Sequence, residues 1–248
     1  MKKNLLPLTV PTLILTGCLS FIAPAFHAAG NTTTWTGGGG DNNWGTPGNW
    51  SGGTTPSGGG NAIINFAGST RLAPFNNYGT FTQYQSILFS SGAGAFTLNG
   101  NNIKFYGKIE NNSSALETVN FTSIVAVGGS GATDNQFNPV FGNLTINNAV
   151  ILDNNSLLNV YGNNSKILTF NGVISNGASS TGSVRVNENS TVVYKGANTY
   201  TGNTEINTGT IRVDANPGNA ISNYFVGNGG TTATAATLLL GGANGTGG

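Results

Sequence analysis

The chain has 248 residues, of which only 7% are charged: nine Lys or Arg stand against eight Asp or Glu, for a formal net charge of +1. Its single Met, Cys and His all lie at or before residue 27. The rest of the chain therefore has no Ser-His-Asp triad, no Cys nucleophile and no His/Cys zinc site. So small a net charge gives no electrostatic basis for binding nucleic acid or an anionic membrane.

Gly and Asn dominate the composition, with 39 and 37 residues. Gly and the 8 Pro together make about 19% of the chain, below the ~25–30% typical of disordered low-complexity chains. The hydrophobic residues, 38% of the total, come in short runs bounded by Gly, Asn or Ser. We therefore expect a folded, all-β chain with a long, thin core.

The first 29 residues have the pattern of a secretory signal peptide. Lys2 and Lys3 precede an apolar stretch over 5–23, and small residues follow at 23–25 and 28–29. A transmembrane anchor is the alternative, but three prolines interrupt the stretch and the small residues suit cleavage. We expect residues 1–29 to be removed on export. The exported part then has no Cys, so no disulfide stabilises it.

Cys18 offers a second route of processing. The residues Leu15-Thr16-Gly17-Cys18 resemble the lipobox of bacterial lipoproteins, in which the Cys is acylated after cleavage before it. The hydrophobic segment 19–26 argues against lipidation, because a lipid tether usually begins with polar residues. Lipidation at Cys18 stays open as an alternative to plain cleavage.

The body of the chain contains short strands and no convincing helix. In chain order, we expect strands at 61–66, 86–89, 95–98, 102–106, 143–146, 149–152, 157–161, 166–170, 183–186, 191–194, 204–206, 210–213 and 237–240. Clean alternation in two of them predicts that four side chains face the core (Val184, Val186, Ile211 and Val213) and that two face solvent (Arg185 and Arg212). Strands this short need neighbours stacked above and below them.

Internal repetition supports such stacking. The turn Gly100-Asn101-Asn102 has an echo in Gly162-Asn163-Asn164, 62 positions later. That spacing divides into three turns of about 20 to 21 residues, which is within the range of solenoid repeats. Gly and Asn both suit turns with positive φ, and Asn can also form ladders. A parallel β-solenoid therefore explains the composition better than its competitor, a β-sandwich, which favours longer, evenly spaced strands.

The segment from Tyr194 to Val213 resembles the autotransporter-associated β-strand repeat, in which a strand is followed by Ser-Gly-Ala-Asn-Thr-Tyr-Thr-Gly-Gly-Thr, a second strand, Asn-Ala-Gly-Thr-Leu and a third strand. The departures are Lys195, Asn203 and Thr208, and none disrupts the pattern. The matching motif residues are Gly196, Asn198, Thr199, Tyr200, Thr201, Gly202 and Gly209. Their expected role is structural, in turns and in satisfying turn backbone groups.

The resemblance implies a right-handed parallel β-helix of the autotransporter passenger type, exported to the cell surface or beyond. It names no catalytic residue. We divide the chain into a signal peptide (1–29), a Trp- and Gly-rich N-terminal cap (30–66) and a β-solenoid (67–248) with the repeat near 191–213. We expect the solenoid to be truncated at its C-terminus.

The three tryptophans of the cap also suggest a carbohydrate site, because indole faces stack on sugar rings. Trp35, Trp44 and Trp50 are unevenly spaced in a Gly-rich stretch, which suits a hydrophobic cap over the first rung better than a flat sugar platform. Asp41 could suggest calcium, but one acid lacks the carboxylate spacing of a calcium loop. We expect no metal site and no cofactor.

Parallel β-helices also host lyases and glycosidases, so paired carboxylates matter. Asp134 with Asp153, and Glu188 with Glu205, have spacings that could place them on adjacent rungs, where two carboxyl groups can act together. Such spacings arise easily by chance among eight acids. Arg185 and Glu205, 20 apart, read equally well as a solvated ion pair. We expect no enzymatic activity.

These observations predict an exported, non-enzymatic structural or adhesive protein, secreted or held at the cell surface. The alternative is a carbohydrate-binding or polysaccharide-degrading β-helix. Expected partners are surface glycans or other host or cell-surface molecules, and not nucleic acid. Contact with the outer membrane would need a missing C-terminal region or a lipid anchor.

Overall fold

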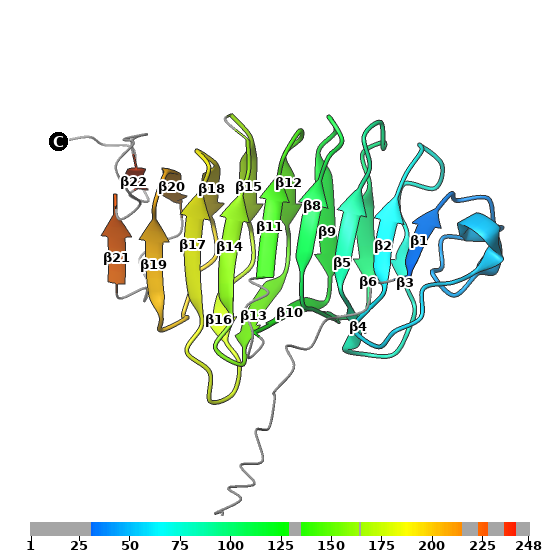
Figure 1. Ribbon diagram of the computed structural model, residues 1–248, viewed down its shortest axis with the longest axis horizontal. Coiled ribbons are helices and arrows are strands. Elements are labelled where there is room, and N and C mark those ends of the chain that lie inside the picture. The colour runs from blue at the N-terminus through cyan, green and yellow to red at the C-terminus, as the bar shows by residue number, and fades with distance from the viewer. Residues whose placement is uncertain (1–30, 129–134, 164, 215–222, 228–235, 242–248) are drawn as a thin grey trace, which may run out of the picture.

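The computed structural model describes residues 31–128, 135–163, 165–214, 223–227 and 236–241. Within them the chain is all β apart from two short 3-10 turns, η1 (Pro47–Asn49) and η2 (Ser51–Gly53). It forms a parallel β-solenoid of about 6 turns, whose strands stack side by side along the molecule (Figure 1). The predicted fold class is thus confirmed, while its right-handed sense stays a prediction. The predicted signal peptide and Cys18 lie outside the described residues.

Three sheets make up the solenoid, and every strand pair in them is parallel. Sheet A contains β1 (Thr32–Trp35), β2 (Ile63–Phe66), β5 (Ser86–Phe89), β8 (Lys108–Asn111), β11 (Asn135–Pro139), β14 (Leu157–Tyr161), β17 (Ser183–Asn187), β19 (Asn203–Ile206) and β21 (Asn223–Val226). Sheet B contains β3 (Phe75–Asn76), β6 (Thr97–Gly100), β9 (Glu117–Phe121), β12 (Leu144–Ile146), β15 (Ile167–Phe170), β18 (Thr191–Tyr194), β20 (Gly209–Val213) and β22 (Ala236–Leu240). Sheet C contains β4 (Thr82–Tyr84), β7 (Ile103–Phe105), β10 (Ser123–Val127), β13 (Ala149–Asp153) and β16 (Ile174–Asn176).

From β5 to β16 the chain visits sheets A, B and C in turn, and after β16 it alternates between A and B. The rungs consequently differ in length. Phe137 pairs with Ile109, 28 positions earlier, whereas Val193 pairs with Arg212, only 19 positions later. Each rung adds or removes residues in its loops while its strands stay in register, so the loops absorb the difference.

The prediction of a constant rung of 20 to 21 residues, made from the echo of the Gly-Asn-Asn turn, is wrong. Gly100 ends β6 in sheet B, whereas Gly162 follows β14 in sheet A, so the two Gly-Asn-Asn turns occupy different corners. Rungs near the predicted length do occur: Arg185 pairs with Glu205, 20 positions on. The solenoid prediction was right, but a single period does not describe the whole chain.

All thirteen predicted strands overlap strands of the structure. The sequence reading missed several others, among them β8, β9, β10 and β11, which occupy one continuous stretch of the chain. β10, with the sequence Ser-Ile-Val-Ala-Val, carries a strong β signal that was overlooked. β11 ends in a proline and contains two Asn and one Gln, so its sequence gives little local signal.

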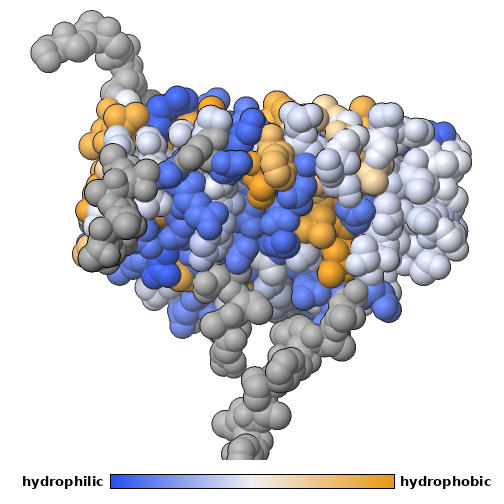
Figure 2. All heavy atoms as spheres, turned by 45° about the horizontal axis from the view of Figure 1, so that its top comes forward, coloured by the Kyte–Doolittle hydropathy of each residue, from blue (hydrophilic) through white to orange (hydrophobic). Residues whose placement is uncertain are grey.

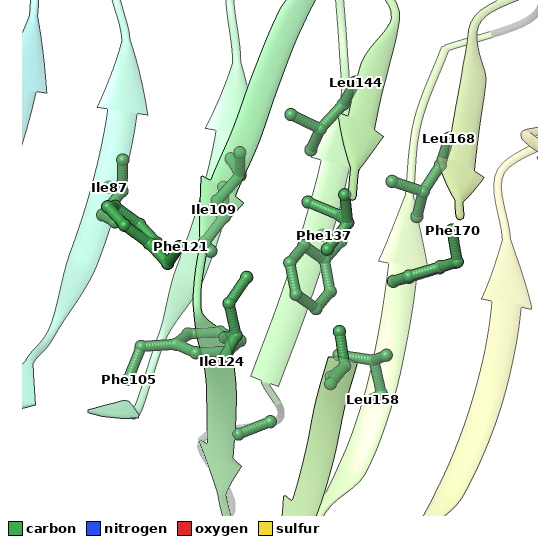
Figure 3. Close-up of a cluster of buried hydrophobic side chains, with 14 of the residues drawn as sticks. Ile87, Phe105, Ile109, Phe121, Ile124, Phe137, Leu144, Leu158, Leu168 and Phe170 are labelled. Carbon is green, nitrogen blue, oxygen red and sulfur yellow. The ribbon is translucent and has the colours of Figure 1, made fainter. Parts of the chain in front are cut away.

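The core is a single column of apolar side chains from all three sheets (Figure 3). Phe137 lies at its middle, with ring centroids 5.4 Å from Phe105 on one side and 5.4 Å from Phe170 on the other. Tyr194 continues the contact at 6.0 Å from Phe170. The four side chains predicted to face inward are buried, as expected: Val184, Val186, Ile211 and Val213.

The N-terminal rung is closed by tryptophans. Trp35, Trp44 and Trp50 are at most 2% exposed, and Trp35 and Trp44 each meet Trp50 edge-on, at 5.1 and 6.1 Å. Their rings also pack on Phe66 of β2. Buried indoles present no face to a sugar, so the carbohydrate platform considered for them is excluded. Among the described residues, the structure contains no helix long and apolar enough to cross a membrane.

Candidate functional site

The outer face of sheet A carries polar side chains in two parallel columns. One column runs through Lys108, Gln136, Asn159, Arg185 and Glu205, and the other through Glu110, Asn138, Tyr161 and Asn187. Parallel in-register pairing places each side chain directly above its neighbour, because alternate residues of a strand point to the same face. Figure 2 shows a surface that is largely hydrophilic, with small separate hydrophobic patches.

Ion pairs neutralise part of this face. Lys108 Nζ lies 2.8 Å from Glu110 Oε2, and Arg185 Nε lies 2.6 Å from Glu205 Oε2. The second contact confirms the predicted ion pair between adjacent rungs. Burial raises the pKa of Glu110, but hydrogen bonds from Lys108, Asn112 and Asn138 outweigh it, so that the net pKa is lowered. Glu110 is therefore ionised and already satisfied within the protein.

A hollow of about 590 Å³ opens where β8, β11 and β14 end and where the loop after β17 passes. It is lined by Glu110, Asn138, Val140, Tyr161, Gly162, Asn163, Glu188 and Asn189. Its volume falls in the range of small-molecule sites, ~300–1,000 Å³. The structure thus places Glu110 and Glu188 on the lining of one hollow although two strands, β11 and β14, lie between β8 and β17 in sheet A. Sequence spacing gave no sign of this shared hollow.

The floor of the hollow is held by Asn138, which is 3% exposed. Its amide nitrogen donates to Glu110 Oε2 at 3.1 Å and to Gln136 Oε1 at 2.9 Å, and its amide oxygen accepts from the backbone N–H of Tyr161 at 3.2 Å. These bonds use both ends of the amide and fix it across three strands. The floor is therefore rigid.

Of the two acid pairs considered from spacing, Glu188 with Glu205 does not form, and Asp134 with Asp153 stays untested. Glu205 is engaged with Arg185, and Glu188 lies in the turn after β17, not beside it. Asp153 ends β13 in sheet C, and Asp134 lies outside the described residues. Within the described part of the chain there is no group of three or more His, Cys, Asp or Glu side chains placed to hold a metal ion.

The repeat motif residues occupy tight corners of the solenoid. A Cβ on Gly196 would meet the carbonyl of Gly172, and one on Gly202 would meet the carbonyl of Gly182. The side-chain oxygen of Asn198 accepts from the backbone N–H of Ile174 at 2.8 Å.

The rest of the motif makes contacts of the same structural kind. Tyr200 is buried, with its hydroxyl 2.6 Å from Thr204 Oγ1, and Thr201 Oγ1 accepts from Asn176 Nδ2 at 2.7 Å. Gly209 has a φ of 96°, which glycine adopts readily. The backbone N–H of Thr199 donates to Ile174 O at 2.9 Å.

Sequence reasoning gave no role to Glu117, which the structure buries completely at the start of β9. Its Oε2 accepts from the backbone N–H of Phe96 at 2.7 Å, and its Oε1 lies 2.6 Å from Ser113 Oγ. Ser113 Oγ also lies 2.8 Å from Asn111 Oδ1. Burial raises the pKa of Glu117 to about 7, against the lowering effect of these hydrogen bonds.

The hydrogen-bond pattern around Ser113 agrees with a protonated Glu117. One hydroxyl proton cannot be donated to both Asn111 Oδ1 and Glu117 Oε1. If Glu117 carries a proton on Oε1, it donates to Ser113 Oγ, which in turn donates to Asn111. Asn111 Nδ2 donates to the carbonyls of Ala115 and Asn143 at 2.9 and 2.8 Å. The network closes a corner between sheets A and B and is sealed from solvent.

No family model, no curated protein and no solved structure matches this chain.

Proposed function

We propose that this chain is an exported, non-enzymatic surface protein whose solenoid acts as a structural and adhesive element of the autotransporter passenger type. The observation that carries the proposal is the outer face of sheet A, where polar side chains are repeated in register from β8 to β19. A repeated, rigid polar face suits many weak contacts along its length. The signal-peptide pattern of residues 1–29 and the repeat pattern of 194–213 support the same function.

Export is tested by expressing the full chain in a Gram-negative bacterium and measuring the mass of the protein outside the cytoplasm. We expect a mature chain that starts after Ala25 or Ala29, because both follow small residues suited to cleavage. A chain that begins at Cys18 and carries acyl groups supports the lipid-anchored alternative. Intact chain that still begins at Met1 and stays in the cytoplasm overturns the proposal.

Adhesion is tested with the purified mature chain on immobilised bacterial and animal cells. Gln136→Ala and Asn187→Ala change one residue in each column. Each should slightly reduce the amount of protein retained on the cells, and the double variant should reduce it more. Substitutions on the face of sheet C, such as Thr82→Ala, serve as the control. Equal retention for all variants contradicts a role for sheet A.

A second function, polysaccharide degradation, is favoured by one observation: the hollow with Glu110 and Glu188 on its lining. Hydrolysis or elimination requires two groups that exchange protons with the substrate. Incubation with a panel of polysaccharides and measurement of new reducing ends or unsaturated products distinguishes the two functions. Activity that disappears in Glu188→Gln establishes the second function in place of the first.

A further inference from the structure

The lining of the hollow divides into groups that the protein uses and groups that it leaves unused. Among the described residues, no hydrogen bond or ion pair involves the side chains of Tyr161, Asn163, Glu188 or Asn189. Glu110 and Asn138 beneath them are fully engaged. A rigid base beneath unused polar groups leaves hydrogen-bond donors and acceptors in place for a ligand.

The unused groups match the chemistry of a sugar. Amide side chains both donate and accept hydrogen bonds, the phenol does the same, and a carboxylate accepts two; sugar hydroxyls likewise donate and accept. Tyr161 and Val140 add apolar surface, and an aromatic ring with a polar tip can lie against the C–H face of a pyranose. The combination fits a polyhydroxylated ligand better than a purely apolar one.

Charge narrows the class of ligand. Lys108 is the cation beside Glu110, and that carboxylate already holds it at 2.8 Å. Glu188 is exposed and adds an unpaired negative charge at the rim. An acidic sugar would therefore meet repulsion without a compensating cation. The hollow suits an uncharged glycan.

Glu188 also has an unusual backbone conformation, which it shares with Arg71, Phe81, Ser165 and Ser179. Glu188 and Asn189 both have a φ of 58°, a left-handed conformation that Asn tolerates and Glu does not favour. The same two-residue turn occurs between β13 and β14, where Asn154 and Asn155 have φ of 51° and 53°. Each turn is fixed by a hydroxyl of the next rung: Asn155 N–H donates to Ser180 Oγ, and Asn189 N–H donates to Thr208 Oγ1.

The contrast between the two turns is informative because their geometry is shared. A turn built from Asn and Asn is the relaxed solution, and the chain uses it at Asn154 and Asn155. The turn beside the hollow carries Glu instead and bears strain there. Strain held at a particular residue suggests a function for its side chain. Here that side chain is the free carboxylate on the rim of the hollow.

We propose that this hollow is a binding site for an uncharged glycan. Its rim consists of Tyr161, Asn163, Glu188 and Asn189, which lie over Glu110 and Asn138. The inference rests on the proposed adhesive function and specifies its ligand class. Tyr161 packs against the sugar ring, and Glu188 accepts hydrogen bonds from a pair of sugar hydroxyls. The side-chain amides of Asn163 and Asn189 fix the orientation of the sugar.

The test is affinity electrophoresis of the mature chain through gels that contain one polysaccharide each: dextran, galactomannan, polygalacturonate or chitosan. We expect retardation by at least one neutral polymer. Tyr161→Ala should lower that affinity by about tenfold or more. Tyr106→Ala is the matched control, because it removes the same side chain away from the hollow, near Gly60. Equal retardation of both variants overturns the proposal.

Glu188→Asn separates a binding role from a structural one. Because Asn suits the left-handed turn, this variant should melt at the same or a higher temperature while its affinity for the neutral polymer falls about fivefold or more. A variant that melts higher and binds as before overturns the role of Glu188. Stronger retardation by polygalacturonate or chitosan than by either neutral polymer overturns the ligand class.

The experiments distinguish a wrong glycan site from a wrong adhesive function. A chain that binds none of the four polymers yet still coats cells overturns the glycan site and leaves the adhesive function standing. A chain that neither binds the polymers nor coats cells overturns both.

Discussion

The rungs that contain β17 to β20 and the rungs that contain β8 to β15 are built differently. In the first set each turn has two strands, and paired residues lie 19 or 20 positions apart. In the second set each turn has three strands, and paired residues lie up to 28 positions apart. Glycine corners with no room for a Cβ occur in both sets, at Gly196 and Gly202 in the short rungs and at Gly142 and Gly172 in the long rungs. What the long rungs add is a corner with a buried carboxyl group, that of Glu117.

The corners show what this difference requires. At Gly196 and Gly202 the backbones of adjacent rungs come so close that no Cβ fits. In the long rungs, the corner between β8 and β9 is filled by Asn111, Ser113 and Glu117, all with 0% exposure. Buried polar groups must satisfy one another, so this corner depends on one particular set of side chains. The corners at Gly196 and Gly202 depend on the absence of a Cβ.

The largest expected effect comes from the core of the long rungs. Phe137→Ala removes a ring that packs on both Phe105 and Phe170, so we expect a loss of about 3–5 kcal/mol in the free energy of unfolding. Val213→Ala, in the short rungs, removes less buried volume and should be milder. Urea titration followed by fluorescence measures both. Equal losses would show that the site of Phe137 relaxes around the lost ring and costs no more than the smaller deletion at Val213.

The next largest effect is the pH dependence of stability that Glu117 gives to its corner in the long rungs. The pKa of Glu117 is about 7 in the folded chain and 4.5 ordinarily. The stability that comes from the protonated group is complete below pH 4.5 and is lost as pH rises towards and through 7, because the unfolded chain releases this proton first. The difference amounts to about 3 kcal/mol.

Glu117→Gln provides the check, because Gln keeps the shape of the protonated acid and can donate to Ser113 in its place. Between pH 4.5 and 7.5 the original chain should lose stability by about 3 kcal/mol, and the variant should lose clearly less. Thermal melting across this range measures both. A variant with the same pH profile as the original shows that Glu117 does not titrate in this way.

A smaller effect is expected at the glycine corners. Gly196→Ala places a methyl group against the carbonyl of Gly172, so adjacent rungs must move apart, at about 1–3 kcal/mol. Gly79→Ala is the matched control, because a Cβ there has nothing within 4 Å. Chemical denaturation should separate the two variants. Equivalent behaviour would show that the short corners have more room than the structure gives them.

The smallest effect concerns the ion pair between rungs. Arg185→Ala should cost up to about 1 kcal/mol, because 33% of the arginine side chain is exposed and solvent screens the pair. A double-mutant cycle with Glu205→Ala, at low and at high salt, isolates the interaction. We expect the coupling energy to shrink in high salt. A coupling that salt does not change would indicate a pair more buried than this one.

The same comparison explains how far sequence reasoning reached. In the short rungs, Val184, Val186, Ile211 and Val213 were placed correctly because alternation within one strand is a local property. In the long rungs, β8 to β11 were missed and the period was misjudged. Loop length there changes from rung to rung, so no fixed spacing appears in the sequence.

By itself, the sequence determined that the described chain is all β, where thirteen of its strands lie, and that they stack as a parallel solenoid. These properties depend on alternation, on Gly and Asn at turns and on short apolar runs, all of which are readable within a few residues. Only the tertiary structure decided that Glu117 is buried and that Glu110, Tyr161 and Glu188 line one hollow. Those neighbours lie on different rungs, and which residues become neighbours depends on the length of every loop between them.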